Sequence, residues 1–228
     1  MRYIAIFILS ILSIQSSYSQ INEFGLFVGG SNFIGDVGST HYISPNQLAI
    51  GGIYKWNKSP RHSYRISLTF TDLKGEDAKS DDPRRIQRDY SFTNQIIEIS
   101  GGLEFTFFDF NLHSGHKVAT PYLYSGIAVT NIEDSYFLNG TQTSQNSSSW
   151  AFGIPMVLGF KSNFLGNLIV GIEVGARYTF SDNIDGSYPK DESLQANRFG
   201  NQNNNDWYTF TGITLTYTFG ENPCYCPN

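Results

Sequence analysis

Charged residues, cysteines and long apolar runs are all scarce in this sequence of 228 residues. Charged residues make up 15% of the chain, against about 25% in typical soluble domains. The formal net charge is −5, which argues against nucleic-acid binding because that function needs a clustered basic surface. After residue 19, no stretch approaches the roughly 20 consecutive apolar residues that a transmembrane helix requires. These shortages exclude a nucleic-acid-binding protein and a bundle of membrane-spanning helices.

The N-terminal segment has the three parts of a secretory signal peptide. Arg2 supplies a positive charge, residues 3–14 form a short apolar region, and Ser17 and Ser19 place small residues ahead of the expected cleavage point. We therefore predict that residues 1–19 are a cleaved signal peptide. An N-terminal anchor helix is the alternative, but the apolar run is shorter than a membrane span.

The abundant feature of the sequence is alternation with a period of two residues, which is the pattern of a β-strand. Residues 168–180 show it most clearly, since one face is apolar throughout and the other carries Glu173 and Arg177 among mostly small residues. A helix would scatter these two sets around its circumference. The same pattern predicts eight strands, near residues 24–30, 48–56, 63–70, 97–107, 122–129, 150–160, 168–180 and 212–219.

Two folds fit eight such strands: a soluble β-sandwich and a membrane barrel whose apolar face points to lipid. The polar face is rich in Gly, Ser and Thr, which suits the cramped interior of a small barrel. Aromatic residues gather at strand ends, as in the interfacial girdles of membrane barrels: Trp56, Trp150, Phe160, Tyr178, Phe180, Trp207, Tyr217 and Phe219. The sequence therefore predicts an all-β fold, an eight-stranded antiparallel transmembrane β-barrel of the OmpX/OmpA-like kind, over residues 20–219.

The connections between the predicted strands alternate between short and long. The short ones lie near residues 57–60, 109–117 and 161–167. The long ones lie near residues 31–46, 72–92, 131–149 and 181–206. Barrels of the outer membrane have short periplasmic turns and long outer loops, so we expect both termini of the mature chain in the periplasm. Residues 220–228 would then form a periplasmic tail.

Six charged residues are predicted to point into the barrel: Lys55, Arg65, Glu98, Glu104, Glu173 and Arg177. Because three are acidic and three basic, we interpret them as ion pairs that fill a lumen too narrow for an aqueous channel. A catalytic pair of carboxylates, Glu98 and Glu104, is the alternative. It is disfavoured because a filled lumen gives a substrate no access. We therefore expect no enzymatic activity and no cofactor.

Histidines and loop charges offer no stronger site. His113 and His116 lie in a predicted periplasmic turn, and two imidazoles without further ligands are weak evidence for a metal. His41 is the single histidine predicted at the outer rim, where a barrel enzyme would need Ser or Asp partners beside it. The second long connection mixes six acids with five bases, and the fourth is rich in asparagine. Both are interpreted as surface loops.

The two cysteines, Cys224 and Cys226, lie in the predicted tail. An exported protein meets an oxidising compartment, where unpaired thiols are not expected to persist. Two hypotheses remain open: a small disulfide between the two residues, and one or two disulfides to a periplasmic partner.

Three blocks of the sequence resemble the PorG family of outer-membrane proteins from Bacteroidota. They are EFGLFVGGSNFIGD, RYTFSDNIDG and, most specifically, NNNDWYTFTGITLTYTFGENPCYC. The resemblance extends from about residue 23 to residue 226. The chain departs from the commoner family form at Asp185 and Gly186, where an acidic pair is usual.

Members of that family are accessory components of the type IX protein secretion system. The resemblance implies a small barrel, surrounded by outer-membrane lipid, that anchors or positions a periplasmic ring made of a lipoprotein and its partner. It implies a part in gliding motility where the host glides, and no catalytic residue or cofactor. It also makes Cys224 and Cys226 candidate contacts with the ring. A general small barrel whose outer loops bind ligands or surfaces is the alternative.

Overall fold

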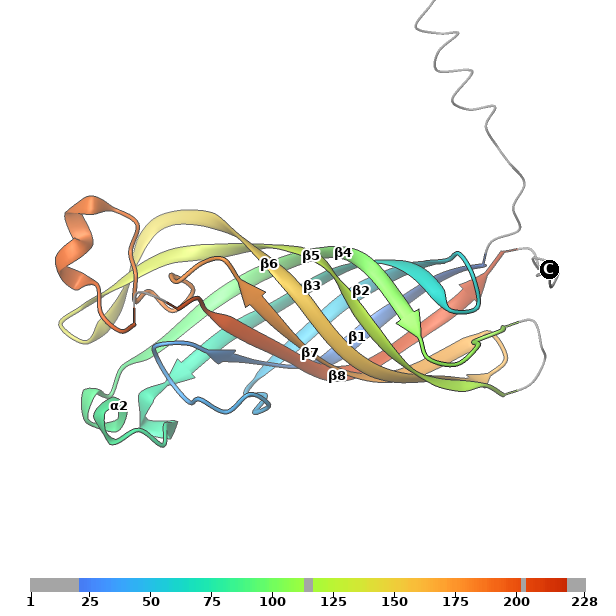
Figure 1. The fold of residues 1–228 in the computed structure, drawn as a ribbon. Coiled ribbons are helices and arrows are strands. Elements are labelled where there is room, and N and C mark those ends of the chain that lie inside the picture. The colour runs from blue at the N-terminus through green and yellow to red at the C-terminus, as the bar shows by residue number, and fades with distance from the viewer. Residues whose placement is uncertain (1–20, 113–116, 202–203, 221–228) are drawn as a thin grey trace, which may run out of the picture.

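The chain forms a closed barrel of antiparallel strands. The computed structural model describes residues 21–112, 117–201 and 204–220. Within these ranges eight strands pair in chain order, and the first pairs with the last to close the sheet (Figure 1). They are β1 (Ile21–Ile34), β2 (Gln47–Asn57), β3 (His62–Glu76), β4 (Ser91–Thr106), β5 (Ala119–Leu138), β6 (Thr141–Leu165), β7 (Leu168–Thr179) and β8 (Trp207–Phe219). The predicted fold class is confirmed.

Three short helices lie in the connections of the described ranges. They are η1 (Asp77–Lys79), α2 (Pro83–Arg88) and η2 (Glu192–Asn197). Asp82 caps α2 by accepting a hydrogen bond from the backbone N–H of Arg84, and Pro83 suits the first helical turn because it has no N–H to satisfy. No helix in the described ranges is long and apolar enough to cross a membrane.

The alternation of side chains is inverted relative to a soluble protein. On β7, Ile172 is 60% exposed, whereas its neighbour Glu173 is 6% exposed. The same inversion holds around the barrel, since most large apolar side chains of the strands face outward and the charged side chains face the lumen. The lumen also holds a buried apolar cluster that includes Phe27, Ile53 and Phe210. A continuous apolar surface of this extent is unstable in water and stable in lipid. The barrel wall is therefore a membrane-spanning surface.

Aromatic side chains border this apolar wall at both ends of the barrel. Trp150, Phe152 and Phe180 are exposed towards one end, and Tyr217 and Phe219 towards the other. Such rings favour the boundary between lipid and water, where one part of the ring is apolar and another is polar. The two borders fit the interfacial girdles that the sequence predicted.

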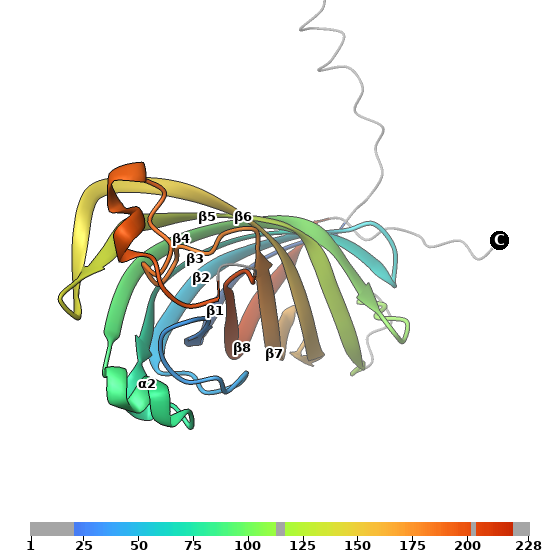
Figure 2. The ribbon, with the colours of Figure 1, turned by 60° about the vertical axis from the view of Figure 1, so that its left-hand side comes forward.

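The two ends of the barrel differ in the length of their connections. At one end, where β1 begins and β8 ends, the connections are residues 58–61, 107–118 and 166–167 (Figure 1). At the other end the helices lie in the connections, and Figure 2 shows the segment of η2 (orange) beside the long β5–β6 hairpin, with α2 on the opposite side.

One predicted long connection is wrong. Residues 131–149 form the outer parts of β5 and β6, joined by a tight turn at Asn139 and Gly140. Asn139 has a φ of 50° and Gly140 a φ of 85°, the combination that a two-residue hairpin turn requires. The apolar alternation ends at the membrane boundary, but the hydrogen-bonded ladder continues above it with polar residues. For the same reason β3 extends to Glu76 and β6 to Leu165.

Glycines on neighbouring strands allow the sheet to curve tightly. A Cβ atom added at Gly102 would lie 2.1 Å from the carbonyl oxygen of Ser125, and one added at Gly126 would lie 2.1 Å from the carbonyl oxygen of Gly101. Larger residues at these two positions would push β4 and β5 apart.

If the wall spans a membrane, the same Ile→Arg substitution should change the stability of the barrel unequally at two similarly exposed positions. Ile213 lies at the middle of β8 and is 55% exposed, whereas Ile43 lies in the connection between β1 and β2 and is 60% exposed. Ile213→Arg should destabilise the barrel by about 2–4 kcal/mol because it places a charge at the bilayer midplane. Ile43→Arg should have little effect. Urea unfolding in lipid vesicles measures both, and equal effects would contradict the assignment.

Candidate functional site

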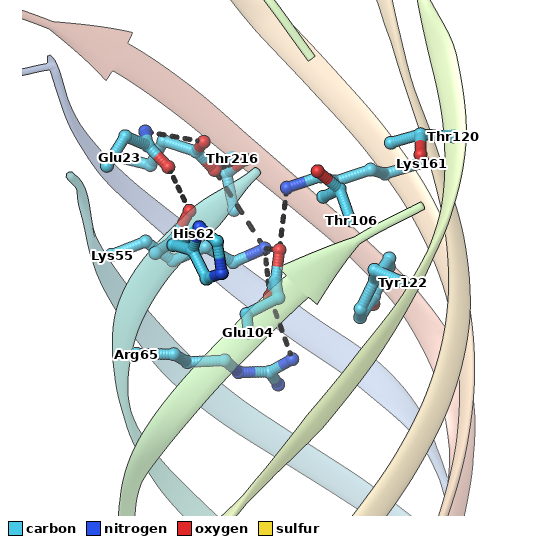
Figure 3. A network of polar contacts seen from close by, with 12 residues as sticks. Glu23, Lys55, His62, Arg65, Glu104, Thr106, Thr120, Tyr122, Lys161 and Thr216 are labelled. Atoms are coloured by element: carbon cyan, nitrogen blue, oxygen red, sulfur yellow. Dashed lines mark hydrogen bonds and ion pairs between the residues drawn. The ribbon is translucent and has the colours of Figure 1, made fainter. Parts of the chain in front are cut away.

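Buried charges from four strands meet in the lumen at Glu104 of β4 (Figure 3). Lys55 Nζ and Lys161 Nζ donate to its Oε1 atom at 3.0 and 2.6 Å. Arg65 Nη1 lies 3.7 Å from its Oε2 atom. Each of these four residues is no more than 2% exposed. The carboxylate is therefore the shared counter-ion of three cations.

The strand register explains why a shared carboxylate is needed. Lys55 of β2 and Arg65 of β3 are direct cross-strand partners, so two positive side chains stand side by side on the lumen face. Like charges in directly opposite positions repel each other, and the repulsion is strong where water is excluded. Glu104, reaching across from β4, lies between them and compensates both.

Arg65 also makes the most regular ion pair of the lumen. Its Nη1 and Nη2 atoms donate to Glu173 Oε2 and Oε1 at 2.7 and 2.9 Å, a two-pronged contact that fixes both groups. Tyr122 OH donates to the same carboxylate at 2.7 Å. The guanidinium lies over the ring of Tyr124, 4.8 Å from its centroid. Glu173 thus joins β7 to β3 and β5 across the barrel.

A second ion pair lies nearer the end that carries the long connections. Arg177 Nε is 3.2 Å from Glu98 Oε2, and Tyr208 OH donates to the same oxygen at 2.6 Å. Arg177 also lies over the ring of Phe210, with its Cζ atom 4.1 Å from the centroid. Aromatic residues therefore contact both members of this pair.

The structure brings all six sequence-predicted lumen residues to the interior and adds two that the sequence reasoning missed. The sequence pattern predicts a short connection at Lys161 and starts the first strand one residue after Glu23. Glu23 accepts hydrogen bonds from Asn57 Nδ2 and Thr216 Oγ1, both at 2.9 Å. The signal was present, because Gly159, Lys161 and Asn163 continue the inward alternation of β6.

Buried charges in the described strands therefore number four acids and four bases, a neutral set: Glu23, Glu98, Glu104 and Glu173 with Lys55, Arg65, Lys161 and Arg177. The two carboxylates considered as a catalytic pair have separate partners. Six residues along one strand separate Glu98 from Glu104 by about 20 Å. The geometry favours ion pairs that fill the lumen over a site for acid–base chemistry.

Hydrogen bonds between the long connections build an ordered cap at one end of the barrel. Asp77 accepts from the backbone N–H of Gly38 at 2.8 Å and from Arg88 Nε at 2.7 Å. Arg88 Nη2 donates to the carbonyl oxygen of Asp36 at 2.7 Å, and Arg85 Nη1 donates to that of Gly38 at 2.8 Å. The mixed-charge connection was expected to be a solvated loop. Part of its charge instead ties it to the first connection.

An aromatic cluster extends this cap to the β5–β6 hairpin and the last connection. Tyr90 stacks on Phe137 with ring centroids 4.7 Å apart, and Phe199 meets both rings edge-on. Arg88 lies over Tyr90 and Phe199. The asparagine-rich connection therefore contributes Phe199 to a packed cluster that joins two connections to the β5–β6 hairpin.

Aspartates join the first connection to the last. Asp185 Oδ2 accepts from the backbone N–H groups of Asp36 and Val37, each at 3.1 Å. Asp36 in turn accepts from the backbone N–H of Asn201. Gly186 has a φ of 81°, a conformation in which an aspartate would be strained.

The histidines of the described ranges form no site. His41 Nε2 lies 3.4 Å from Asp81 on the surface, and His62 contacts Ser59 and Phe105. No group of three or more His, Cys, Asp or Glu side chains in these ranges is arranged to hold a metal ion. His113 and His116 lie outside the described residues.

The tail lies outside the described residues as well. Cys224 and Cys226, the candidate contacts with a partner, lie in residues 221–228, which the structure does not describe. The predicted signal peptide, residues 1–19, also lies outside the described ranges. Both assignments stay predictions.

The fold and its lipid-facing wall define an outer-membrane β-barrel with a filled, charge-compensated lumen. The sequence matches the family described as "Domain of unknown function (DUF6089)" over residues 2–228, and the chain belongs to that family. No curated protein matches the sequence.

Solved structures with a similar barrel come from several bacteria. The attachment invasion locus protein Ail of Yersinia pestis, in complex with the heparin analogue sucrose octasulfate, is 10% identical; the match covers 88% of this chain and 99% of that one, with a TM-score of 0.49. The N-terminal β-barrel domain of Pseudomonas aeruginosa OprF is 11% identical, with coverages of 89% and 98% and a TM-score of 0.47. At such low identity these likenesses concern the fold and not the function.

The aspartates of the connections predict that part of the stability of the cap increases as the pH falls. Burial, followed by the charges of Asp36 and Asp185, raises the pKa of Asp182 to about 7, and burial also raises the pKa of Asp185. The folded loops therefore bind more protons than the unfolded chain, whose aspartates titrate near pH 3.9. The contribution of these aspartates to the stability of the cap is fully present below about pH 4 and is lost as the pH rises through about 7.

Hydrogen exchange of residues 183–200, corrected for the intrinsic pH dependence of exchange, measures this effect. Protection should be higher at pH 5 than at pH 8, and Asp182→Asn should reduce the difference. Asp81→Asn, on the exposed surface, serves as the control. Protection that rises with pH in the wild type would contradict the prediction.

Proposed function

We propose that this barrel is a non-enzymatic outer-membrane component of the type IX protein secretion system that anchors or positions the periplasmic lipoprotein ring. The observation that carries the proposal is the resemblance of the C-terminal block to the PorG family. That block runs through β8 and into residues 220–226. It therefore combines a strand held in the membrane with a segment that continues beyond it.

The lumen supports an anchoring role over a transport role. Its eight buried charges compensate one another, and each is no more than 6% exposed. An eight-stranded barrel has room for such side chains but not for a folded or unfolded polypeptide. Secreted protein would therefore pass elsewhere, and this barrel would contribute its attachment to the membrane.

The proposed orientation places both termini in the periplasm. The end where β1 begins and β8 ends has the short connections, as the periplasmic end of outer-membrane barrels does. The tail with Cys224 and Cys226 would then project towards the periplasmic ring, and the cap of long connections would face the outside of the cell.

The second candidate function is a general barrel whose outer connections bind ligands or surfaces. The cap favours this reading, because loops held together by Asp77, Arg88 and an aromatic cluster present a defined surface rather than a mobile one. The tail separates the two functions, since an adhesin needs no periplasmic cysteine pair.

Truncation after Gly220 tests the proposal. In a mild-detergent pull-down, the wild-type barrel should recover the ring lipoprotein, and the truncated barrel should lose most of it while secretion falls. Arg88→Ala, which opens the cap at the opposite end, is the control and should leave recovery unchanged. The heat-modified gel shift of folded barrels shows that both variants fold.

A non-reducing gel then separates the roles of the cysteines. A band that shifts on reduction, and is lost in Cys224→Ser or Cys226→Ser, would indicate a disulfide to the partner. Full recovery of the lipoprotein by the truncated barrel, with normal secretion, would contradict the proposal. Loss of surface binding in Arg88→Ala with secretion intact would favour the second function.

A further inference from the structure

The outer part of β6 has one paired edge and one open edge. The ladder between β6 and β7 begins at Gly153 and Thr179, so residues 141–151 of β6 pair only with β5. β7 ends at this level, and Thr179 Oγ1 lies within hydrogen-bond distance of the carbonyl oxygens of Ser181 and Asp206. No backbone hydrogen bond between residues 141–151 and the last connection occurs within the described residues.

The direction of the backbone groups on this edge follows from the register. Phe152 accepts from the N–H of Phe180 on the β7 side, so its backbone points away from β5. Groups on one edge of a strand recur every second residue, which places Ser148 and Trp150 on the same edge.

A second contact also indicates that the backbone groups of Ser148 point to the open edge. The backbone N–H and C=O of Glu133, the partner of Ser148 on β5, bond to the side chain of Asn94 on the β4 side. Glu133 therefore does not bond to Ser148, and the N–H and C=O of Ser148 must point to the open edge.

This edge lacks two of the features that usually protect a free strand, although a bulge interrupts it opposite Asp134. Residues 141–150 contain no charged residue and no proline, which are the residues that natural edges use to prevent pairing. The strand is held firmly from its other side, since Ser147 and Ser149 donate to Asp134 at 2.9 and 2.7 Å. The open edge is thus an ordered template, interrupted only at Asn146, where φ is 55°.

We propose that this open edge binds an extended segment of another protein, which adds a strand to the barrel wall above the membrane. Backbone hydrogen bonds to Ser148 and Trp150 would supply the recognition, as in other cases of strand addition. Trp150 is 56% exposed and would pack against an apolar or β-branched residue opposite it. The neighbouring hydroxyl side chains fit an uncharged segment.

A second copy of the chain in the same membrane does not fit this edge. Two barrels in one membrane are related by an axis along the membrane normal, and their strands tilt by about 35–45°. The two β6 edges would then cross at roughly 70–90° and could not form a ladder. The occupant is therefore a different chain, free to align with β6. The inference does not depend on the proposed role in secretion.

Amide exchange measured by NMR on the full barrel in micelles tests the proposal residue by residue. Ser149 and Ala151, whose N–H groups face β5, act as internal controls and should be protected. Ser148 and Trp150 should exchange rapidly. At about 1 mM, an uncharged heptapeptide of alternating Thr and Val should slow the exchange of Ser148 and Trp150 by about tenfold. The same peptide N-methylated at alternate amides should not.

A pair of variants checks that the edge itself is responsible. Ser148→Ala keeps the outward N–H and should retain the effect of the peptide on Trp150, whereas Ser148→Pro removes that N–H and should abolish it. The proposal is overturned if Ser148 and Trp150 are protected without peptide, or if the peptide has no effect. It is also overturned if the N-methylated peptide protects equally. Protection that depends on barrel concentration alone would indicate a second copy instead.

Discussion

Charge compensation at Glu104 is the constraint on which the interior of this barrel depends. A small barrel excludes water from its lumen, and an uncompensated charge there is strongly unfavourable. The register makes Lys55 and Arg65 neighbours, and Lys161 approaches from β6. One carboxylate, placed on β4 where all three can reach it, makes the arrangement possible. The lumen around Glu104 is consequently filled and charge-compensated, and this ionic cluster accompanies a buried apolar cluster that includes Phe27, Ile53 and Phe210.

This polar core explains how functions are distributed over the molecule. Because ion pairs occupy the described lumen, we propose that interactions with other proteins take place at the two ends of the barrel. One end carries a cap whose connections are joined through Asp77, Arg88 and Phe199. The same end carries the free edge of β6. The C-terminal segment continues from the end where β8 stops.

The sequence predicted the barrel well because lipid imposes a strict two-residue alternation on every strand, as at Ile172 and Glu173. It predicted the hairpin poorly because Asn139 and Gly140 lie above the membrane, where no apolar face marks the strands. Lys161 was missed for a related reason, since β6 continues past the apolar residues that define it. The cap could not be predicted, because its contacts join residues as distant as Asp36 and Asp185.

A double-mutant cycle on Glu104 and Lys161 tests the central claim most directly, with the free energy of unfolding measured in urea and lipid vesicles. Glu104→Gln leaves a net positive lumen and should cost about 3–5 kcal/mol. Lys161→Met alone leaves a net negative lumen and should also destabilise. The double variant restores neutrality and should be more stable than Glu104→Gln alone. Additive effects, or a Glu104→Gln barrel as stable as the wild type, would contradict the account.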